Sequence, residues 1–450
     1  MAFSVAGARV LVVGAARSGI AAAELLARRG ARVVLTDTRP EPGDEASRLA
    51  AVGVALEFGE HRPETFAAAD LIVLSPGVPS QQPVLETARA RGIEVIGEVE
   101  LASRWLHGRV IAITGTKGKS TTTTLTGRML AEDGRRAMVG GNIGLALSAQ
   151  VDQSTPDTLH VVEVSSFQLE TSITFRPWIA VLLNFSADHL DRHVTVNEYA
   201  RAKQRIFVNQ RPDDWAVVNA DSAEALAIAS EVRAQQIRFA IDRSLEEGVI
   251  IAGDHVVRRS TDGDRPLLPL KAVRVLGRHL LSDVVGATAV ASIVGVGRDA
   301  ITRAVEGFGG LEHALELVAE VRGVRFVNDS KATNIASALQ AIESFDGGLV
   351  VILGGRFKGG DFRDLRGAIQ RRAEAVVAIG ESRALVREAL ADVVRVDERD
   401  TMRDAVRTAH EAAPPNGVVL LAPACASFDM FRDYAERGRV FKEEVRRLEQ

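Results

Sequence analysis

The sequence predicts an α/β protein built from three α/β domains in tandem. Short apolar runs rich in valine and isoleucine alternate with stretches of helical periodicity, as in "RVLVVGA" (9–15) followed by "GIAAAELLARRG" (19–30). Continuous apolar runs between helices are typical of parallel strands that are covered on both faces. The chain has 450 residues, which is long enough for roughly three domains.

The composition disfavours several classes of protein. Net charge is -4 and no lysine/arginine tail is present, so nucleic acid is not an expected partner. No apolar run reaches the ~18 residues that a membrane span needs. The single cysteine, Cys425, excludes a disulfide framework and fits a reducing compartment. Arg9 interrupts what would be the apolar core of a secretory signal. We therefore expect a cytoplasmic enzyme that acts as a monomer without a membrane or nucleic-acid partner.

The first predicted domain, residues 1–97, is Rossmann-like, with strands in 9–15, 31–37 and 69–77. The turn "GAARSG" has the first and last glycines of the dinucleotide fingerprint G-x-G-x-x-G, but Ala16 replaces the middle one. Asp37 ends the second strand, where an acid that binds a ribose or a base would lie. Because the middle glycine is replaced, the motif fits a tight turn that serves only packing equally well. The replacement also disfavours nicotinamide chemistry.

The second predicted domain, residues 98–307, is of the P-loop ATPase type. Strand 109–114 runs into "ITGTKGKST" (113–121) and a helix over 120–134. A full P-loop reads G-x-x-x-x-G-K-[ST], and here the first glycine is displaced to Gly115. Glycines still allow backbone N–H groups to converge on an anion at the positive end of a helix. A strand–turn–helix with solvated lysines is the alternative.

Polar residues follow two further predicted strands of this domain. Glu163 lies near the end of strand 158–166, and strand 178–186 leads into the loop "NFSADHLDRH" (184–193). Such positions point into the crevice where α/β proteins bind ligands. Glu163 with Ser120 suits Mg²⁺, and the loop suits metal or phosphate binding, although ion pairs and polar caps are common alternatives. The polar side chains of the loop are Asn184, Asp188, His189, Asp191 and His193.

The third predicted domain, residues 308–450, is a second Rossmann-like unit. It begins near "VRFVNDSKATN" (324–334) and continues through the apolar runs "GLVVILGG", "EAVVAIG" and "GVVLLAPACAS" to a charged C-terminal helix. A β-rich segment, containing "QIRFAID" and "GVIIAGDHVVR", precedes it at the end of the central domain.

Five motifs in order carry a resemblance that spans essentially the whole chain. They are "TGTKGKST", "EVSSFQLE", "NFSADHLDRH", "YARAKQRIF" and "VNDSKATN", and together they resemble the Mur ligases of peptidoglycan synthesis. With "PACASFDMFRDYAERG" they look like the branch that joins D-glutamate to UDP-N-acetylmuramoyl-L-alanine. The Asn-Pro-Arg motif of the diamino-acid branch is absent from the sequence. Folylpolyglutamate synthases share the central loop but lack the uridine-binding domain.

The resemblance implies a reaction and a role for each domain. The first domain would hold the UDP end of the precursor, the second ATP and the third D-glutamate. ATP would phosphorylate the substrate carboxylate, and the amine of D-glutamate would then attack the acyl phosphate to give an amide, ADP and phosphate. Two anions must approach each other, so the site needs cations.

The resemblance also implies the site residues. Lys119, Glu163, His189 and Lys203 would be catalytic, and two Mg²⁺ ions would be held by Ser120, Glu163, His189 and a carbamylated Lys203. By pattern alone Lys203 is a solvated lysine. ATP would contact Gly115, Thr116, Lys117, Gly118, Lys119, Ser120, Thr121, Asp283, Asp329 and Lys331. The precursor would contact Arg17, Ser18, Asp37, Thr38, Arg39, Gly77 and Asn142. D-glutamate would contact Thr333, Lys358, Ser427 and Phe428.

The sequence departs from the family pattern near the nucleotide. Lys117 replaces an asparagine, and "GRHLLSD" has Leu280 and Asp283 in place of the asparagines of G-x-H-N-x-x-N. "LEHALE" has Ala314 where the family has an arginine that contacts ATP. We therefore expect reduced ATP affinity or a substitute cation. Another Mur-type ligase, a folylpolyglutamate synthase-like ligase, a nucleotide-dependent oxidoreductase and a degenerate nucleotide-binding module are the alternatives.

Overall fold

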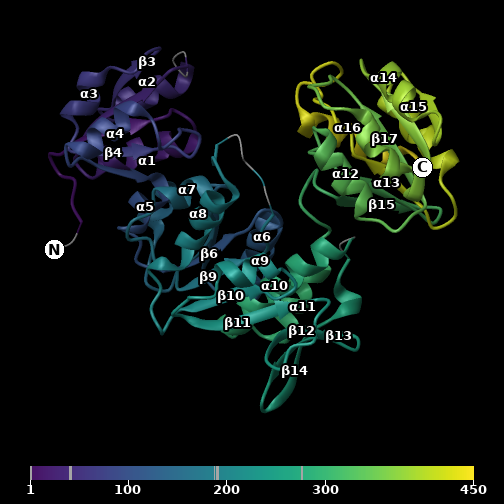
Figure 1. The fold of residues 1–450 in the computed structure, drawn as a ribbon, viewed down its shortest axis with the longest axis horizontal. Helices are drawn as coiled ribbons and strands as arrows, with labels where there is room; N and C mark the ends of the chain where they lie inside the picture. The colour runs from purple at the N-terminus through teal and green to yellow at the C-terminus, as the bar shows by residue number, and fades with distance from the viewer. Residues whose placement is uncertain (1–2, 40–42, 187, 189–191, 275–276, 450) are drawn as a thin grey trace. The chain divides into compact units, whose positions relative to one another are not determined.

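The computed structural model describes residues 3–39, 43–186, 188, 192–274 and 277–449. These residues form three β-sheets with helices packed against them (Figure 1). The chain divides into two units, Met1–Ala272 with Ser282–Val305, and Val273–Leu281 with Glu306–Gln450. The first two sheets belong to the first unit and the third sheet belongs to the second. The predicted α/β fold class is confirmed.

The first sheet is fully parallel, in the order β3-β2-β1-β4-β5. Alternate residues of its strands pack into two cores, one against α1 and α5 and the other against α3 and α4. Both faces are thus buried, which explains the continuous apolar runs. The strands are β1 (Arg9–Val13), β2 (Arg32–Asp37), β3 (Ala55–Phe58), β4 (Leu71–Leu74) and β5 (Glu94–Gly97). The helices are α1 (Arg17–Arg28), α2 (Gly43–Ala51), α3 (Pro63–Ala68), α4 (Pro83–Ala90) and α5 (Glu98–Ser103).

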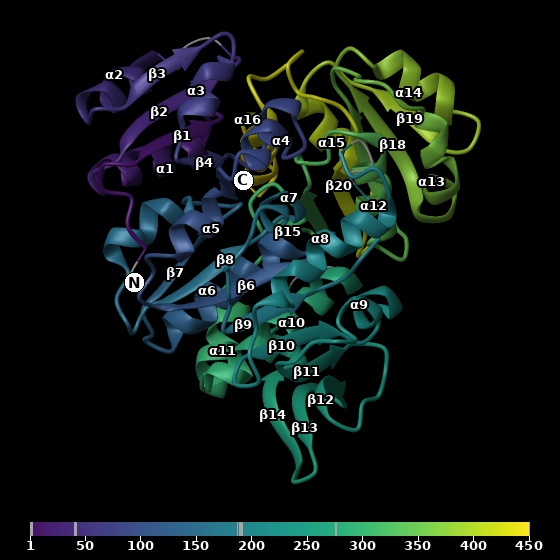
Figure 2. The same cartoon turned by 60° about the vertical axis from the view of Figure 1, so that its left-hand side comes forward.

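The second sheet has the order β14-β13-β12-β11-β10-β9-β6-β8-β7 and is parallel from β7 to β12. The antiparallel hairpin of β13 and β14 projects from it (Figure 1 and Figure 2). Its strands are β6 (Arg109–Thr114), β7 (Ala137–Gly141), β8 (Leu159–Glu163), β9 (Ile179–Leu182), β10 (Trp215–Asn219), β11 (Gln235–Ala240), β12 (Gly248–Ala252), β13 (His255–Ser260) and β14 (Gly263–Pro269). The helices are α6 (Lys119–Glu132), η1 (Leu147–Gln153), α7 (Ser166–Glu170), α8 (Val196–Val208), α9 (Ala223–Ile228), η2 (Leu270–Ala272), α10 (Arg278–Val294) and α11 (Arg298–Glu306).

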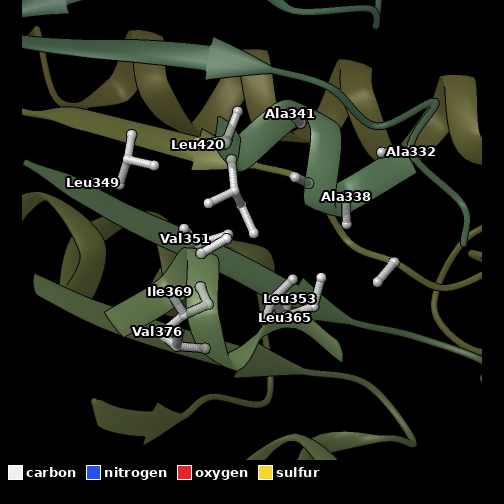
Figure 3. Packing of buried hydrophobic residues seen from close by; sticks show 14 of the residues in the cluster. Ala332, Ala338, Ala341, Leu349, Val351, Leu353, Leu365, Ile369, Val376 and Leu420 are labelled. Atoms are coloured by element: carbon white, nitrogen blue, oxygen red, sulfur yellow. The ribbon is translucent and has the colours of Figure 1, made fainter. Parts of the chain in front are cut away.

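The third sheet has the order β15-β16-β20-β17-β18-β19, and only β15 is antiparallel to its neighbour among the described strands. Figure 3 shows one of its cores, where Leu349, Val351 and Leu353 face helical residues such as Ala338 and Ile369. The strands are β15 (Glu316–Val321), β16 (Val324–Asn328), β17 (Leu349–Gly354), β18 (Ala373–Ile379), β19 (Arg395–Glu398) and β20 (Val418–Leu421). The helices are α12 (Ile335–Glu343), η3 (Phe362–Leu365), α13 (Arg366–Arg372), α14 (Arg383–Leu390), α15 (Met402–Ala412) and α16 (Tyr434–Arg447).

Two central strands are shorter than the sequence predicts. The structure ends β8 at Glu163 rather than at 166, because Ser165 is the N-cap of α7 and forms a capping box with Gln168. It ends β9 at Leu182, beyond which Asn184 turns back onto the loop before α6. In both cases the polar residues that follow the strand lie outside the sheet and are available to form the site. No helix in the described ranges is long and apolar enough to cross a membrane.

The buried carboxylate of Glu100 fixes α5 to the loop that follows α7. Its Oε2 accepts the backbone N–H groups of Ile173, Thr174 and Phe175 at 3.0, 3.0 and 2.8 Å, and Arg104 Nε donates to its Oε1 at 2.9 Å. A buried carboxylate is stable only when its oxygens are satisfied in this way. Helix α5, which follows the last strand of the first sheet along the chain, is therefore held against the loop between α7 and β9.

Candidate active site

The phosphate-binding loop connects β6 to α6. Gly118 has φ 79° and caps α6 in the left-handed region, which favours glycine. Lys119 then begins the helix, and Thr121 is buried in its first turn. The first N–H groups of a helix have no intrahelical partner and the helix dipole is positive there, so this loop suits an anion.

Asn184, at the end of β9, holds the loop in shape. Its Oδ1 accepts the N–H groups of Thr116 and Lys117 at 3.1 and 2.9 Å, and its Nδ2 donates to the Lys117 carbonyl at 3.1 Å. Lys119 Nζ donates to the carbonyls of Gly115 and Thr116 at 3.1 and 2.8 Å. The Lys119 ammonium therefore lies directly over the loop that would surround the phosphates.

Ser120 and Glu163 meet at the carboxyl ends of β6 and β8. Ser120 Oγ donates to Glu163 Oε2 at 2.6 Å, and Asn142 Nδ2 donates to Glu163 Oε1 at 2.7 Å. Glu163 is buried. A hydroxyl and a carboxylate are oxygen donors of the kind that Mg²⁺ prefers, with water and phosphate completing its coordination. The two residues fit one magnesium ion. His189, predicted for a second ion, lies outside the described residues.

Lys203 is buried beside this loop, with 1% of its surface exposed. Its Nζ donates to the Gly115 carbonyl at 2.7 Å and lies 4.6 Å from the centre of the Tyr199 ring. Burial, with a smaller contribution from Lys119, lowers the pKa of Lys203 to about 7. Much of this lysine is therefore an uncharged amine at neutral pH.

The interpretation of Lys203 as a solvated lysine is wrong. Tyr199, Ile206 and Phe207 are buried residues of α8 that lie four residues before and three and four residues after Lys203. Helical neighbours at these spacings share a face, so Lys203 belongs to the apolar face of α8. This spacing was a usable signal, and the surrounding arginines obscured it.

Asp283, predicted near the adenine, packs against the phosphate-binding loop. Its side chain is buried, and a Cβ built on Gly118 would lie 2.0 Å from its Oδ1. Among the described residues, its Oδ2 has no hydrogen-bond partner. Burial raises the pKa of Asp283 to about 8, and the nearby Thr122 hydroxyl and the charge of Lys119 only partly oppose this shift. Asp283 is therefore a neutral acid at pH 7, close in character to the amide it replaces.

We expect Asp283→Asn to stabilise the protein more at pH 8 than at pH 5. The pKa of Asp283 is about 8 in the folded state and about 4 in an unfolded chain. Between these two pKa values the folded state keeps Asp283 protonated while the unfolded chain does not. The contribution of Asp283 to the free energy of unfolding therefore falls as pH rises. An amide does not titrate. Thermal unfolding of both proteins at each pH measures the difference, and an equal melting-temperature change at pH 5 and pH 8 would contradict it.

All seven predicted precursor residues line one cavity of about 660 Å³ at the carboxyl edge of the first sheet. Asp37 Oδ2 accepts the Ala15 N–H at 2.7 Å and Arg39 Nη2 at 2.7 Å, and this arginine holds the pKa of the Asp37 carboxyl well below its usual range. Arg17 Nη2 donates to the Asn142 carbonyl at 3.4 Å. The residues are Arg17, Ser18, Asp37, Thr38, Arg39, Gly77 and Asn142.

Sequence reasoning missed His61, which lines the same cavity. Its Nδ1 lies 3.0 Å from Thr36 Oγ1 at the end of β2. His61 follows β3, whose carboxyl end is at the same edge of the parallel sheet as that of β2. That position was the available signal, since a histidine just beyond a parallel strand faces the ligand crevice.

The predicted residues of the second unit occupy loops at the carboxyl ends of β16, β17 and β20. Asp329 Oδ1 accepts the Leu315 N–H at 3.2 Å, and burial raises the pKa of Asp329 to about 7. Lys358 Nζ lies 5.8 Å from the centre of the Phe428 ring, which is 58% exposed. Ser427 is buried, Thr333 is half-buried and Lys331 is exposed. These loops therefore present cations and hydroxyls at one edge of the sheet.

The remaining departures have structural roles in the second unit. Leu280 is buried in the apolar core shown in part in Figure 3. Ala314 is half-buried between two residues in the left-handed region, His313 at φ 64° and Leu315 at φ 47°. Asn328 Nδ2 lies 3.0 Å from His313 Nδ1 and supports that turn.

Three family models match consecutive parts of the chain. The "Mur ligase MurD-like, N-terminal domain" matches residues 8–97, the "Mur ligase middle domain" matches 113–291, and the "Mur ligase, glutamate ligase domain" matches 315–425.

Several curated proteins are similar along nearly their whole length. The UDP-N-acetylmuramoylalanine--D-glutamate ligase of Koribacter versatilis is 44% identical over 446 residues, covering 99% of this chain and 98% of the relative. The ligases of the same name from Acidobacterium capsulatum and Geotalea uraniireducens are 44% and 42% identical over 443 residues. These alignments cover 98% of this chain in both cases, and 96% and 98% of the relatives.

Solved structures share the fold at lower identity. The UDP-N-acetylmuramate-alanine ligase of Thermotoga maritima is 16% identical with a TM-score of 0.59, covering 98% of this chain and 99% of that one. A pseudomurein peptide ligase type C from Methanothermus fervidus is 17% identical with a TM-score of 0.55, covering 98% of this chain and 100% of that one.

Proposed function

The chain belongs to the Mur ligase family, and from that premise we propose that it joins D-glutamate to UDP-N-acetylmuramoyl-L-alanine at the expense of ATP. One geometric observation carries the proposal. Asn142 lines the 660 Å³ cavity and also donates to Glu163, which accepts the Ser120 hydroxyl of the phosphate-binding loop. A nucleotide on the loop and a precursor in the cavity would therefore meet at Asn142, as transfer of a phosphoryl group to the precursor's carboxylate requires.

We assign residues 1–97 to the precursor, 98–307 to ATP and 308–450 to D-glutamate. In the first step a carboxylate oxygen of the precursor attacks the γ-phosphorus and ADP leaves. In the second the D-glutamate nitrogen attacks the acyl carbon, loses a proton and displaces phosphate. Lys119 and the N-terminus of α6 stabilise the charge on the transferred group. The negative charge of the transferred phosphoryl group is the reason why the loop presents a cation and several N–H donors.

Ser120 and Glu163 are the residues we assign to Mg²⁺. When bound, the ion would neutralise phosphate charge that the loop alone leaves unpaired. The short Ser120–Glu163 hydrogen bond brings the two oxygens to one place, where a single ion would contact both.

We also propose that Lys203 carries a carbamate. Its uncharged amine attacks the carbon of CO₂, an N–C bond forms as one C–O π bond opens, and an amine proton leaves to solvent, so a buried neutral amine becomes an anion. The proposal is supported by burial of the amine and by its lowered pKa of about 7. An anion here would attract the positive charge of Lys119, which now repels Lys203.

Orthophosphate release tests the proposed function. Protein, ATP, Mg²⁺, UDP-N-acetylmuramoyl-L-alanine and D-glutamate are incubated together, and each substrate is then omitted in turn. We expect release only with the complete mixture. Activity with L-lysine or diaminopimelate in place of D-glutamate would assign the protein to another Mur branch. No release with any amino acid would favour the degenerate nucleotide-binding module.

The arginine that the family places at position 314 gives a separate prediction. We expect Ala314→Arg to lower the KM for ATP several-fold, because it restores a cation for a polyphosphate. Steady-state kinetics with ATP varied at saturating precursor and D-glutamate measures the change. If KM and turnover stayed at the wild-type values, Ala314 would be neutral and another cation would already serve ATP.

We further propose that the protein acts in the cytoplasm as a monomer. The single cysteine, Cys425, is buried and unpaired, which suits a reducing compartment. Sedimentation of the purified protein tests the monomer directly.

A further inference from the structure

Arg437, in the first turn of α16, is buried inside the second unit with 1% of its surface exposed. Its guanidinium makes three hydrogen bonds to neutral oxygens. Nε donates to Ser330 Oγ at 2.9 Å, Nη2 to the Ser330 carbonyl at 2.8 Å and Nη1 to the Cys425 carbonyl at 3.0 Å. Burial lowers the pKa of Arg437 to about 10, so it remains charged at neutral pH.

These bonds connect loops that belong to different strands. Ser330 follows β16 and Cys425 follows β20, its parallel neighbour. A third loop, after β17, is close as well, since a Cβ built on Gly355 would lie 3.3 Å from Nη1. One side chain thus bonds to the loops that carry Thr333 and Ser427 and lies next to the start of the loop that carries Lys358.

The loops need such support because part of their backbone is strained. Ala424 has φ 59°, and its N–H donates to the Ala332 carbonyl at 2.9 Å. A residue other than glycine keeps this conformation only where its surroundings impose it. Burying a guanidinium is also costly, and an apolar side chain would fill the same space at lower cost. The presence of a charged side chain at this buried position is therefore explained better by its hydrogen bonds to the loops than by packing alone.

We propose that Arg437 is a positioning residue of the amino-acid site, which sets the spacing of Thr333, Lys358 and Ser427 and thereby the affinity for D-glutamate. The proposal rests on the proposed function, which supplies D-glutamate as the ligand of these loops. Arg437 acts only through the loops, because its side chain is buried and three of its five N–H donors bond to Ser330 and Cys425.

The test compares Arg437→Met and Arg437→Lys with wild type in steady-state kinetics. We expect Arg437→Met to raise the KM for D-glutamate by about tenfold or more, because several charge-assisted hydrogen bonds are lost. The KM values for ATP and for the precursor should stay within about twofold of those of wild type. Arg437→Lys should recover part of the loss. The control is Arg372→Met, a half-buried arginine just before β18 whose Nε donates to the Phe345 carbonyl at 2.8 Å.

The proposal would be overturned if turnover of Arg437→Met fell while all its KM values stayed at those of wild type. It would also be overturned if the KM of Arg437→Met for D-glutamate equalled that of wild type. Ser330→Ala removes the Nε acceptor, together with the bond that Ser330 Oγ donates to the Tyr434 carbonyl at 2.7 Å, but keeps the guanidinium. It replaces Arg437→Met if that variant does not fold. Hydrogen exchange of residues 329–334 and 423–428 gives a readout that needs no activity. Faster exchange in both segments shows that Arg437 orders the loops, even if wild type fails to use D-glutamate and the proposed ligand is wrong. Unchanged exchange overturns the positioning role.

Discussion

Lys119→Ala is expected to abolish useful turnover, with kcat about a thousandfold below wild type. Removing one preorganised electrostatic contact to a developing charge lowers rates by about 10²–10³, and the Lys119 ammonium lies against the carbonyls of this loop. Its Nζ already lies 3.1 and 2.8 Å from the carbonyls of Gly115 and Thr116, so the charge is in place before ATP arrives. Single-turnover measurements with saturating ATP separate loss of chemistry from loss of binding.

The matched control for Lys119→Ala is Arg128→Ala. Arg128 is an exposed cation on the same helix, α6, about two and a half turns after Lys119. We expect turnover within about twofold of wild type, because an exposed charge contributes little at a distance. Near-wild-type turnover of Lys119→Ala itself would refute its role on the phosphates.

Lys203→Ala is expected to reduce turnover by about 10² or more, and a short carboxylate such as formate should restore part of it. Truncation leaves a space beside Gly115 into which a small anion can enter and replace the carbamate. Loss of one positioned charge in a buried site accounts for the size of the effect. Turnover measured against formate concentration is the readout. An active, formate-independent variant would rule out the carbamate.

The pH dependence of wild type gives an independent test of the same idea. Only the uncharged amine reacts with CO₂, and the pKa of Lys203 is about 7. At the same concentration of dissolved CO₂, activity in CO₂-depleted protein should therefore recover more slowly at pH 6 than at pH 8. Arg201→Ala, an exposed cation on α8, is the control and should show neither formate rescue nor altered CO₂ dependence.

Local patterns in the sequence were sufficient for the elements and for much of the site. Apolar runs that end in glycine located β1 and β6, and the loop "TGTKGKS" located the start of α6 to within one residue. Such signals are local, because strand burial and helix capping depend on neighbours along the chain. The resemblance supplied the precursor residues, and the structure brings all seven of them to one cavity.

Other features depend on residues far apart in the chain, and only the tertiary structure decided them. The contact of Asp283 with Gly118, the burial of Lys203 against Gly115 and the bonds from Arg437 to Ser330 and Cys425 each join distant segments. Sequence determined the fold class, the loop chemistry and the family. Protonation states and loop spacing were set by the fold, because desolvation and hydrogen bonding depend on which groups surround a side chain in space.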